Sequence, residues 1–475
     1  MVINELQSKK ISNLFKVLGK QRRFPPSTPL CSHSISPHQN YINPNSKTLV
    51  HIIPPSFIIR SKVVQTHACS KSLSTHVDDL SLCVEFFVYL CIMDKNEFKG
   101  SQRVGILGGG QLGRMFIQSA ISFDVSVEIL ENSLDAPCAE IANSFTLGDI
   151  NDFESVYNFG KNLNILTVEI ENVNIEALEK LESEGVKVIP KPSAIKIIKN
   201  KIKQKGFYQV NEIPTSDFVV THTKESLPHH HAFLPAVHKL GEGGYDGKGV
   251  QIIRTTDDFE KGFDAPSVLE KMVAIDKELA MIVAIAQDGT ATLYPPAEMI
   301  FDPVLNLLDY QISPAIIPEK VYWKAEAIAL KLVKAFNSPG LFAVELFVTK
   351  EQEVFVNETA PRVHNSGHHS IEANYSSQYD MLWRIMLNYP LGNPDAILPS
   401  AIVNILGAEG HSGDAVYTNL DDVLRMDNVF VHLYGKKQTK PGRKMGHVTI
   451  MHSDYKELRY KANKIKHTLK VEAKK

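Results

Sequence analysis

The sequence predicts an α/β protein of about three domains, the first of which contains a parallel sheet. From Val104 onward, short apolar runs alternate with segments of helical periodicity, and strands separated by helices form parallel sheets. The chain has 475 residues, 43% of them hydrophobic. Because domains average roughly 150 residues, this is enough for three ordinary cores.

The expected N-terminal domain, residues 93–193, carries the parallel sheet. Its first strand, VGIL, begins at Val104, a helix is expected from Gln111 to Phe123, and two more apolar strands are expected at residues 125–130 and 165–171. The connections between these strands are long enough to hold helices, which is typical of parallel pairing.

Two further domains are expected. A central domain, residues 194–388, opens with a Lys-dense helix from Ala194 to Val210 and contains the Gly-rich stretch Gly241 to Gly249. A small C-terminal domain, residues 389–475, contains strands such as AIVNIL and ends in a charged amphipathic helix.

The first 92 residues differ in composition from everything after them. They are rich in Ser, Pro, His and Lys, contain four acidic residues and show no sustained periodicity, so we expect disorder. The polar run after Met93 favours an over-extended start upstream of the true one. The alternative is an organelle transit peptide, because such peptides are also basic, Ser-rich and acid-poor.

The composition argues against several function classes. Lys and Arg number 51 against 53 Asp and Glu, a net charge of −2, which gives no reason to expect nucleic acid or an anionic membrane as partner. No run reaches the roughly 18 to 20 apolar residues of a membrane helix, so we expect a soluble, cytoplasmic protein. Four of the five cysteines precede residue 93, which argues against a disulfide framework or zinc cluster in the main body.

The motif Gly108 to Gly113, GGGQLG, lies between the first expected strand and the first expected helix. Backbone N–H groups in this context hold phosphates, and Glu131 after the next strand stands where a dinucleotide-binding domain has its ribose carboxylate. A nicotinamide enzyme is therefore one alternative. Glycines that only allow close packing of helix and strand are another.

The segment from Lys239 to Gly249 combines five glycines with Tyr245, Asp246 and two lysines. Glycines allow a loop to fold over phosphates, while lysines neutralise them. A flexible surface turn would explain the glycines but not the reactive side chains between them.

Two apolar strands around residues 341–348 and 353–358 carry facing acids. With a two-residue turn at Glu351 and Gln352, paired residue numbers sum to 703 and Glu345 lies opposite Glu358. Like charges in this position destabilise a hairpin, so the pair predicts a cation such as Mg2+. The alternative is a register shifted by one residue, with one glutamate in solvent.

Other polar residues are less specific on their own. Asn357 would reach such a cation only from the opposite face of its strand, and Glu270 and Glu278 have the character of ordinary solvated acids. The stretch from Ala360 to His369 is dense in hydrogen-bond donors, which is typical of recognition loops. The basic turn after Lys437 is either a solvated charge run or a phosphate clamp.

Four motifs together resemble one family, the N5-carboxyaminoimidazole ribonucleotide synthetases of the ATP-grasp superfamily. They occur in the family's order over about Arg103 to Met451: GGGQLGRM, GGYDGKG, NETAPRVHNSGH and KPGRKMGH. The resemblance implies an ATP-grasp fold with an N-terminal pre-ATP-grasp domain, a central ATP-grasp domain and a small C-terminal domain.

The resemblance also implies a reaction. ATP, bicarbonate and Mg2+, with Mn2+ as a substitute, would carboxylate 5-aminoimidazole ribonucleotide in purine biosynthesis, through carboxyphosphate. It further implies a homodimer and functional coupling to a mutase that acts on the product. No nucleic acid or membrane partner is expected.

Site residues follow from matching positions. Those implied at the reaction centre are Tyr245, Asp246, Lys248, Arg362 and His364, with Asp246 a candidate proton acceptor. Those implied for ATP are Lys201, Lys239, Gly244, Gly247, Gly249, Glu270, Glu278 and Asn357. Those implied for the substrate are Glu171, Asn365, Ser366, Lys437, Arg443 and Lys444, and those for the metal are Glu345 and Glu358.

Some features leave alternatives open. Glu169 fits the substrate position nearly as well as Glu171, and the chain departs from relatives at Leu240, at Gly241 and over Pro296 to Phe301. Another ATP-grasp ligase would lack the two C-terminal motifs. A nicotinamide enzyme would leave the acidic hairpin unexplained, and a non-catalytic nucleotide-binding regulator would be favoured only by loss of a metal carboxylate.

Overall fold

The computed structural model describes residues 102–244, 249–301 and 308–474. The predictions for residues 1–92 and for Tyr245, Asp246, Gly247 and Lys248 therefore lie outside the described residues. Within the described ranges, no helix is both long and apolar enough to cross a membrane.

A parallel sheet in the order β3-β2-β1-β4-β5 forms the N-terminal part, as predicted. Its first helix continues into a 3-10 turn, so the helical region ends at Phe123 as expected. The elements are β1 Val104–Leu107, α3 Gln111–Ala120, η2 Ile121–Phe123, β2 Val127–Glu131, β3 Ser144–Leu147, α4 Phe153–Gly160, β4 Ile165–Val168, α5 Ile175–Ser183 and β5 Lys187–Val188.

The Lys-dense segment is two helices rather than one. The chain breaks at Asn200, whose side chain accepts a hydrogen bond from the backbone N–H of Lys203 and caps the second helix, a role for which asparagine is strongly preferred. The prediction of a single helix from Ala194 to Val210 was therefore wrong. The two helices are α6 Pro192–Ile198 and α7 Lys201–Val210.

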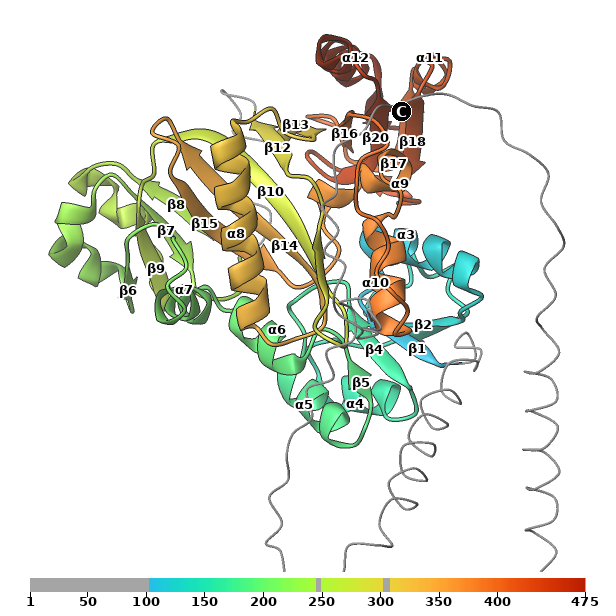
Figure 1. Cartoon of the computed structure of the whole chain (residues 1–475), viewed down its shortest axis with the longest axis horizontal. Helices are drawn as coiled ribbons and strands as arrows, with labels where there is room; N and C mark the ends of the chain where they lie inside the picture. Colours follow the sequence, from blue (N-terminus) through green and yellow to red (C-terminus); the bar gives the residue numbers. More distant parts are fainter. Residues whose placement is uncertain (1–101, 245–248, 302–307, 475) are drawn as a thin grey trace, which may run out of the picture. The chain divides into compact units, whose positions relative to one another are not determined.

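A small antiparallel sheet in the order β6-β9-β7-β8 follows α7. Its strands lie beside each other in Figure 1, apart from the longest sheet. The elements are β6 Phe218–Thr221, η3 Lys224–Phe233, β7 Ala236–Leu240, β8 Val250–Ile253, η4 Thr256–Lys261 and β9 Ser267–Lys271.

The longest sheet among the described residues runs in the order β15-β14-β10-β12-β13-β16-β20-β18, with β11 beside β10. Helix α8 lies along β14 and β10, where its apolar face packs into a shared core (Figure 1). Its first elements are β10 Ile275–Ile285, β11 Ala291–Leu293, β12 Ala297–Phe301, β13 Leu308–Ser313, α8 Glu319–Ala335, β14 Gly340–Thr349, β15 Val354–Ala360, η5 Asn365–Gly367, α9 Ser370–Ala373 and α10 Gln378–Met386.

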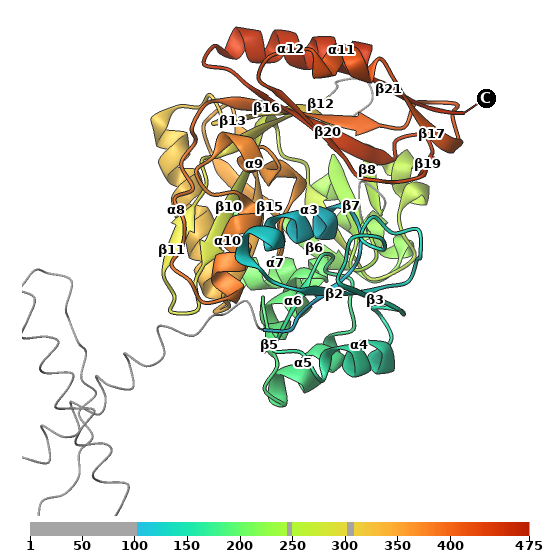
Figure 2. The same cartoon turned by 90° about the vertical axis from the view of Figure 1, so that its right-hand side faces the viewer.

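The C-terminal strands extend this same sheet, because β16 pairs with β13. Helix α12 covers the outer side of β16 and β20 (Figure 2). The expected boundaries, 193/194 and 388/389, stay predictions, since one sheet runs across the second of them. The remaining elements are β16 Ser400–Leu406, β17 Gly413–Thr418, α11 Leu420–Leu424, β18 Val429–Leu433, β19 Gln438–Thr439, β20 Lys444–Met451, α12 Tyr455–Thr468 and β21 Lys470–Ala473.

Helix α10 joins the N-terminal sheet to the long one. The rings of Phe116 and Trp383 stack with centroids 4.2 Å apart, and Trp383 Nε1 donates to the carbonyl oxygen of Phe116 at 3.0 Å. Both rings belong to the largest buried cluster. This packing gives the loop before α10 a rigid support.

Candidate active site

The Gly-rich motif after β1 binds the chain's own carboxylates. Gly109 N donates to Glu131 at 2.8 Å, while Gly110 N and Leu112 N both donate to Glu169. A Cβ on Gly110 would lie 2.6 Å from a carboxylate oxygen of Glu169. The N-terminus of α3, which attracts anions, is thus occupied by Glu169. The nicotinamide alternative loses both its phosphate site and its ribose carboxylate.

The acidic hairpin differs in register from the prediction. Its turn has three residues, Lys350 to Gln352, with Gln352 in the left-handed region at φ 63°. Pairs beside the turn therefore sum to 702, as in Val348 with Val354, so the predicted two-residue turn was wrong. A β-bulge restores the sum of 703 at Val344 and Thr359. The extra residue absorbed by the bulge offsets the extra residue of the turn.

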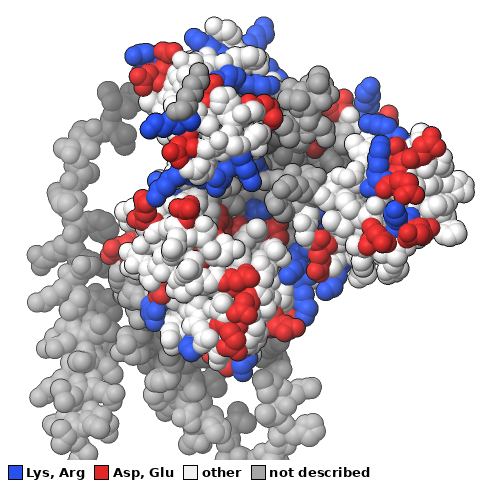
Figure 3. Space-filling model, turned by 180° about the vertical axis from the view of Figure 1, so that it is seen from behind, with Lys and Arg blue, Asp and Glu red and all other residues white. Residues whose placement is uncertain are grey.

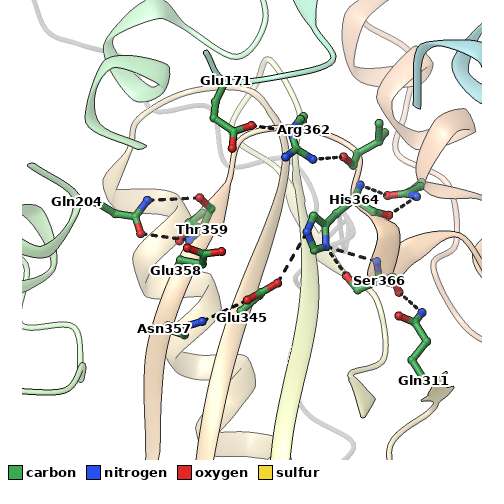
Figure 4. A network of polar contacts seen from close by, with 12 residues as sticks. Glu171, Gln204, Gln311, Glu345, Asn357, Glu358, Thr359, Arg362, His364 and Ser366 are labelled. Carbon is green, nitrogen blue, oxygen red and sulfur yellow. Dashed lines mark hydrogen bonds and ion pairs between the residues drawn. The ribbon is translucent and has the colours of Figure 1, made fainter. Parts of the chain in front are cut away.

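The bulge places Glu345 opposite two residues, Asn357 and Glu358. Asn357 Nδ2 donates to Glu345 Oε2 at 3.2 Å, and Figure 4 shows the three side chains converging from β14 and β15. The expectation that Asn357 reaches from the opposite face was wrong, because the bulge interrupts the alternation of side chains along the strand.

The charges around this pair are unequal. Lys201 forms an ion pair with Glu358, and its ammonium lowers the pKa of Glu358. Burial raises the pKa of Glu345, and the negative charges of Glu358 and Glu278 raise it further. Burial also raises the pKa of Glu278 to about 7. This end of the site holds more acid than its lysine neutralises.

A second lysine connects the hairpin to the small sheet. Lys239 Nζ lies 2.9 Å from Asn357 Oδ1 and 3.1 Å from Glu270 Oε1. Burial alone would raise the pKa of Glu270, but Lys239 and Lys205 outweigh it and lower that pKa to about 2. Glu270 is therefore a buried, ionised acid rather than the solvated one its sequence context suggested.

Lys205 was missed in the sequence. Its Nζ lies 2.8 Å from Glu270 Oε2, and both side chains are at least 96% buried. The spacing to Lys201 was the available signal, because residues four apart share one face of a helix. That face of α7 points toward the acids.

The glycine segment between β7 and β8 is described at its base only. Leu240 N donates to Gly249 O at 2.9 Å, which closes the base of the connection, and Gly244 lies against Gly249. Gly244 and Gly249 directly adjoin residues 245–248, which lie outside the described residues.

Arg362 and Glu171 form a partly buried ion pair just beyond β15. Arg362 Nε donates to Glu171 Oε2 at 2.7 Å. Burial would raise the pKa of Glu171, but the guanidinium holds it below its usual range. The sequence could not distinguish Glu169 from Glu171 as the substrate-contacting acid. In the structure Glu169 binds the glycine motif, whereas Glu171 faces the loop after β15 (Figure 4).

His364 lies between that loop and the acidic hairpin. Its Nδ1 is 2.9 Å from Ser366 Oγ, and its Nε2 is 3.8 Å from Glu345 Oε1. Burial lowers the pKa of His364 to about 4, and the charges of Arg362 and Lys444 act in the same direction. The ring is neutral at physiological pH. Asn365 follows it, half-buried at the start of η5.

Of the predicted basic residues, Lys444 acts on this centre, since its charge reaches His364. Lys437 instead pairs with Glu140 at 2.9 Å, with both side chains mostly exposed. Arg443 donates to Gln438 O at 2.7 Å within the turn. Lys436, which the sequence analysis passed over, donates to the carbonyl oxygen of Lys444 at 2.8 Å. Figure 3 shows Lys and Arg side chains gathered along a hollow on one face of the molecule.

The donor set suits a hard cation but does not complete its coordination. Among the described residues, no group of three or more His, Cys, Asp or Glu side chains is arranged to hold a metal. Glu345, Glu358 and Asn357 offer oxygens, which Mg2+ prefers, and Mg2+ usually takes further oxygens from water and phosphates. The residues fit Mg2+ only together with a phosphate ligand.

The fold and the site together define an ATP-grasp ligase. A family model described as an ATP-grasp domain matches residues 206–379. A ribonucleotide synthetase preATP-grasp domain matches residues 101–199, and a phosphoribosylaminoimidazole carboxylase C-terminal domain matches residues 400–461. The predicted fold class, three domains with an ATP-grasp centre, is confirmed.

The particular family follows from individual relatives. The chain is 33% identical over 355 residues to the N5-carboxyaminoimidazole ribonucleotide synthase of Bacillus subtilis (strain 168), covering 73% of this chain and 91% of that protein. It therefore belongs to the N5-carboxyaminoimidazole ribonucleotide synthase family, and the predicted family is confirmed.

Two other similarities set the extent of the match. A structure of the Aspergillus clavatus N5-carboxyaminoimidazole synthase with ADP and 5-aminoimidazole ribonucleotide has a TM-score of 0.70 and 30% identity, covering 78% of this chain and 100% of that one. The chloroplastic phosphoribosylaminoimidazole carboxylase of Vigna aconitifolia is 35% identical over 359 residues, 74% of this chain. The chain spans only 64% of that protein's length.

Proposed function

We propose that this chain carboxylates 5-aminoimidazole ribonucleotide with ATP and bicarbonate, giving N5-carboxyaminoimidazole ribonucleotide, ADP and phosphate. One observation carries the proposal: the acidic hairpin and the donor-rich loop meet, with His364 Nε2 3.8 Å from Glu345 Oε1. A nucleotide phosphate bound at the hairpin would then lie beside the loop that would hold bicarbonate, the acceptor of the phosphoryl group.

The nucleotide end is built from α7, the small sheet and the hairpin. Lys201 and Lys239 would neutralise the phosphates, since both already bind acidic or amide oxygens at the hairpin. Glu270 and Glu278 would contact the adenosine part, as the family resemblance implies. Gly244 and Gly249 would hold the base of the loop over it, and Gly247 is assigned to that loop by the resemblance alone.

The metal end consists of Glu345 and Glu358, with Asn357 as a further oxygen donor. Mg2+ bound there, or Mn2+ in its place, would offset the charge of the transferring phosphoryl group. The three side chains would orient the cation from one face of the hairpin.

The chemistry needs two bonds to form and two to break. A bicarbonate oxygen attacks the γ-phosphorus and ADP leaves; the substrate amine then attacks the carboxyl carbon and phosphate leaves. Arg362, His364, Asn365 and Ser366 would hold the anionic intermediate, because they present donors beside the hairpin. The amine also loses a proton, for which the sequence predicts Asp246, with Tyr245 and Lys248 beside it.

The substrate end combines Glu171 with the basic C-terminal strand. Lys444 is favoured for the substrate phosphate because its charge reaches the centre, whereas Lys437 and Arg443 bind elsewhere in this structure. A homodimer, coupling to a mutase that consumes the product and a cytoplasmic location are part of the proposal and rest on the resemblance and the composition.

The test is ADP release measured with and without 5-aminoimidazole ribonucleotide and bicarbonate. We expect release to require both, and the carboxylated product to form in equal amount. Release that needs bicarbonate and a different amine would instead indicate another ATP-grasp carboxylase. ADP release that depends on neither 5-aminoimidazole ribonucleotide nor bicarbonate would contradict the proposal.

A further inference from the structure

The residues assigned to the metal and to the intermediate lie on one short run of chain, residues 358–366. It starts in β15, an edge strand that pairs with β14 on one side and makes an isolated bridge, Thr215 with Val356, on the other. The chain leaves the sheet after Ala360. Beyond that point the backbone has no strand partner until η5. Something else must fix the positions of Glu358, Arg362 and His364 relative to one another.

A buried glutamine pairs with the backbone near the C-terminal end of this stretch. Gln378, at the start of α10 and 0% exposed, accepts from His364 N at 2.8 Å and donates to His364 O at 2.8 Å. One side chain thus pairs with both backbone groups of His364, as a neighbouring strand would. A Cβ on Gly367 would lie 2.6 Å from Gln378 Oε1, so only glycine lets the loop fold onto the amide.

Gln204 repeats this arrangement at the other end. It lies on α7, is 3% exposed, and accepts from Thr359 N at 3.3 Å while donating toward Thr359 O at 3.4 Å. Tyr208 OH donates to Gln204 Oε1 at 2.8 Å, which fixes the orientation of the amide. Gln204 therefore occupies the open edge of β15 next to Glu358.

A third glutamine holds the end of the run. Gln311 on β13 is 1% exposed, and its Nε2 donates to Ser366 O at 2.8 Å. Figure 4 shows the amides of Gln204 and Gln311 at opposite ends of the network, with Glu345, Glu358, Arg362 and His364 between them.

We propose that Gln204, Gln378 and Gln311 are positioning residues that hold the backbone of residues 358–366. They fix the spacing between the metal carboxylate of Glu358 and the loop whose donors would hold the anionic intermediate. We call these three residues the glutamine clamp. Its effect on catalysis rests on the proposed function, whereas its effect on the position of the backbone does not. The three amides come from three separate elements, so they tie α7, β13 and α10 to the run.

The amide is the side chain that meets this need. It offers a donor and an acceptor without charge, whereas a glutamate at position 378 would place its oxygens against His364 O. A leucine of similar size would leave both backbone groups of His364 buried without a partner, which is costly. Misplacing reacting groups by about 1 Å costs on the order of 100-fold in rate.

The decisive measurement is amide hydrogen exchange over residues 358–366 in the full chain. In Gln378→Leu we expect exchange at residues 362–366 to rise about tenfold or more, with β10 and β14 unchanged. In Gln204→Leu the rise should centre on Thr359. Gln378→Glu, which keeps the acceptor for His364 N, should give a smaller rise.

Turnover provides the second readout. Gln378→Leu should keep the KM for ATP within about twofold while kcat falls about tenfold or more, and less carboxylated product should form per ADP. Gln287→Leu is the matched control. Gln287 also donates to backbone carbonyls, of Ile385 and Met386, but away from the run, so product per ADP should stay at the wild-type ratio.

Several outcomes would overturn the clamp. Unchanged exchange over residues 358–366 in a folded Gln378→Leu protein would do so, and so would a rise spread equally over the whole chain. Failure of both Gln378 variants to fold would assign the residue to folding alone. If ADP release by the wild-type protein does not depend on 5-aminoimidazole ribonucleotide, the proposed function is wrong. The hydrogen-exchange result still tests whether the three glutamines hold the backbone.

Discussion

Two regions of this molecule each hold a pair of partly buried glutamates, and the two pairs are bound in different ways. Under the Gly-rich motif, Glu131 and Glu169 accept hydrogen bonds from backbone N–H groups of that motif. In the acidic hairpin, Glu345 and Glu358 face each other with Asn357, Lys201 and His364 around them. Backbone N–H groups satisfy the first pair, whereas the second pair presents facing carboxyl oxygens of the kind that a hard cation binds.

The largest effect that would test this contrast is expected from the hairpin. Glu345→Gln and Glu358→Gln should each lower turnover by about 1,000-fold or more, because both are needed to hold the metal that orients the phosphates. Residues that act as a unit are strongly non-additive, so the double variant should be hardly worse than the worse single one. The stability of Glu345→Gln should stay level or rise slightly, since a repulsion is removed. Glu358→Gln should instead be less stable, because it breaks the ion pair with Lys201.

Steady-state ADP release over a range of Mg2+ concentrations, together with denaturant unfolding, measures both quantities. Near-normal turnover of either single variant at limiting Mg2+ would place the metal ligands elsewhere.

The glycine motif should respond in stability instead. Glu169→Gln turns one of the two acceptor oxygens at the N-terminus of α3 into a donor that faces backbone N–H groups, so the free energy of unfolding should fall by about 2 kcal/mol. Glu131→Gln, which affects the single bond from Gly109, should cost about half as much. Urea unfolding monitored by circular dichroism gives both values. A stable Glu169→Gln protein would remove the distinction between the two regions.

The contrast also shows where sequence reasoning succeeded. Strand–helix alternation predicted the parallel sheet of the N-terminal part because parallel crossovers require helices. The four motifs identified the family, since their order is specific. What the sequence could not supply was the compensation within the hairpin: a turn one residue longer and a bulge at Glu345 restore the predicted pairing while moving Asn357 to the metal face.

Contacts between residues far apart in the sequence could not be predicted either. Nothing near Glu169 in the sequence indicates that it lies under a motif 59 residues earlier, and the glutamines of the proposed clamp carry no signal beyond their polarity. Lys205 was accessible from helical spacing. The break before α7 was accessible too, because Asn200 is a strong N-cap residue.

Lys205 and Glu270 combine features of the two regions. Glu270 is a buried acid, as part of the fold, but its partner is a lysine side chain rather than backbone N–H groups. The folded-state pKa of Glu270, about 2, lies below the usual value for a glutamate, about 4.3. Its contribution to stability is therefore present above pH 4.3 and lost as the pH falls through about 2. Lys205→Met leaves only Lys239, so the Glu270 pKa should rise.

The free energy of unfolding should then fall by about 1 to 2 kcal/mol at pH 7, and the gap to wild type should narrow below pH 4.3. Unfolding curves at pH 7, 5, 4 and 3 measure this gap. A gap that widens on acidification would show that Glu270 does not depend on Lys205.

The smallest effect is expected at Lys437, where the family resemblance and the geometry disagree. The resemblance assigns it to the substrate phosphate, but its ammonium pairs with Glu140 at the surface, where such pairs contribute little, at most about 1 kcal/mol. Lys437→Ala should therefore change kcat/KM for 5-aminoimidazole ribonucleotide by less than about twofold. Lys444→Ala is the matched comparison and should lower it at least tenfold, since its charge already acts on His364. Substrate saturation curves for both variants at one low ionic strength decide between the assignments, because loss of a phosphate contact raises KM most at low salt. Equal losses in the two variants would return Lys437 to the phosphate site and imply that its pairing with Glu140 breaks when substrate binds.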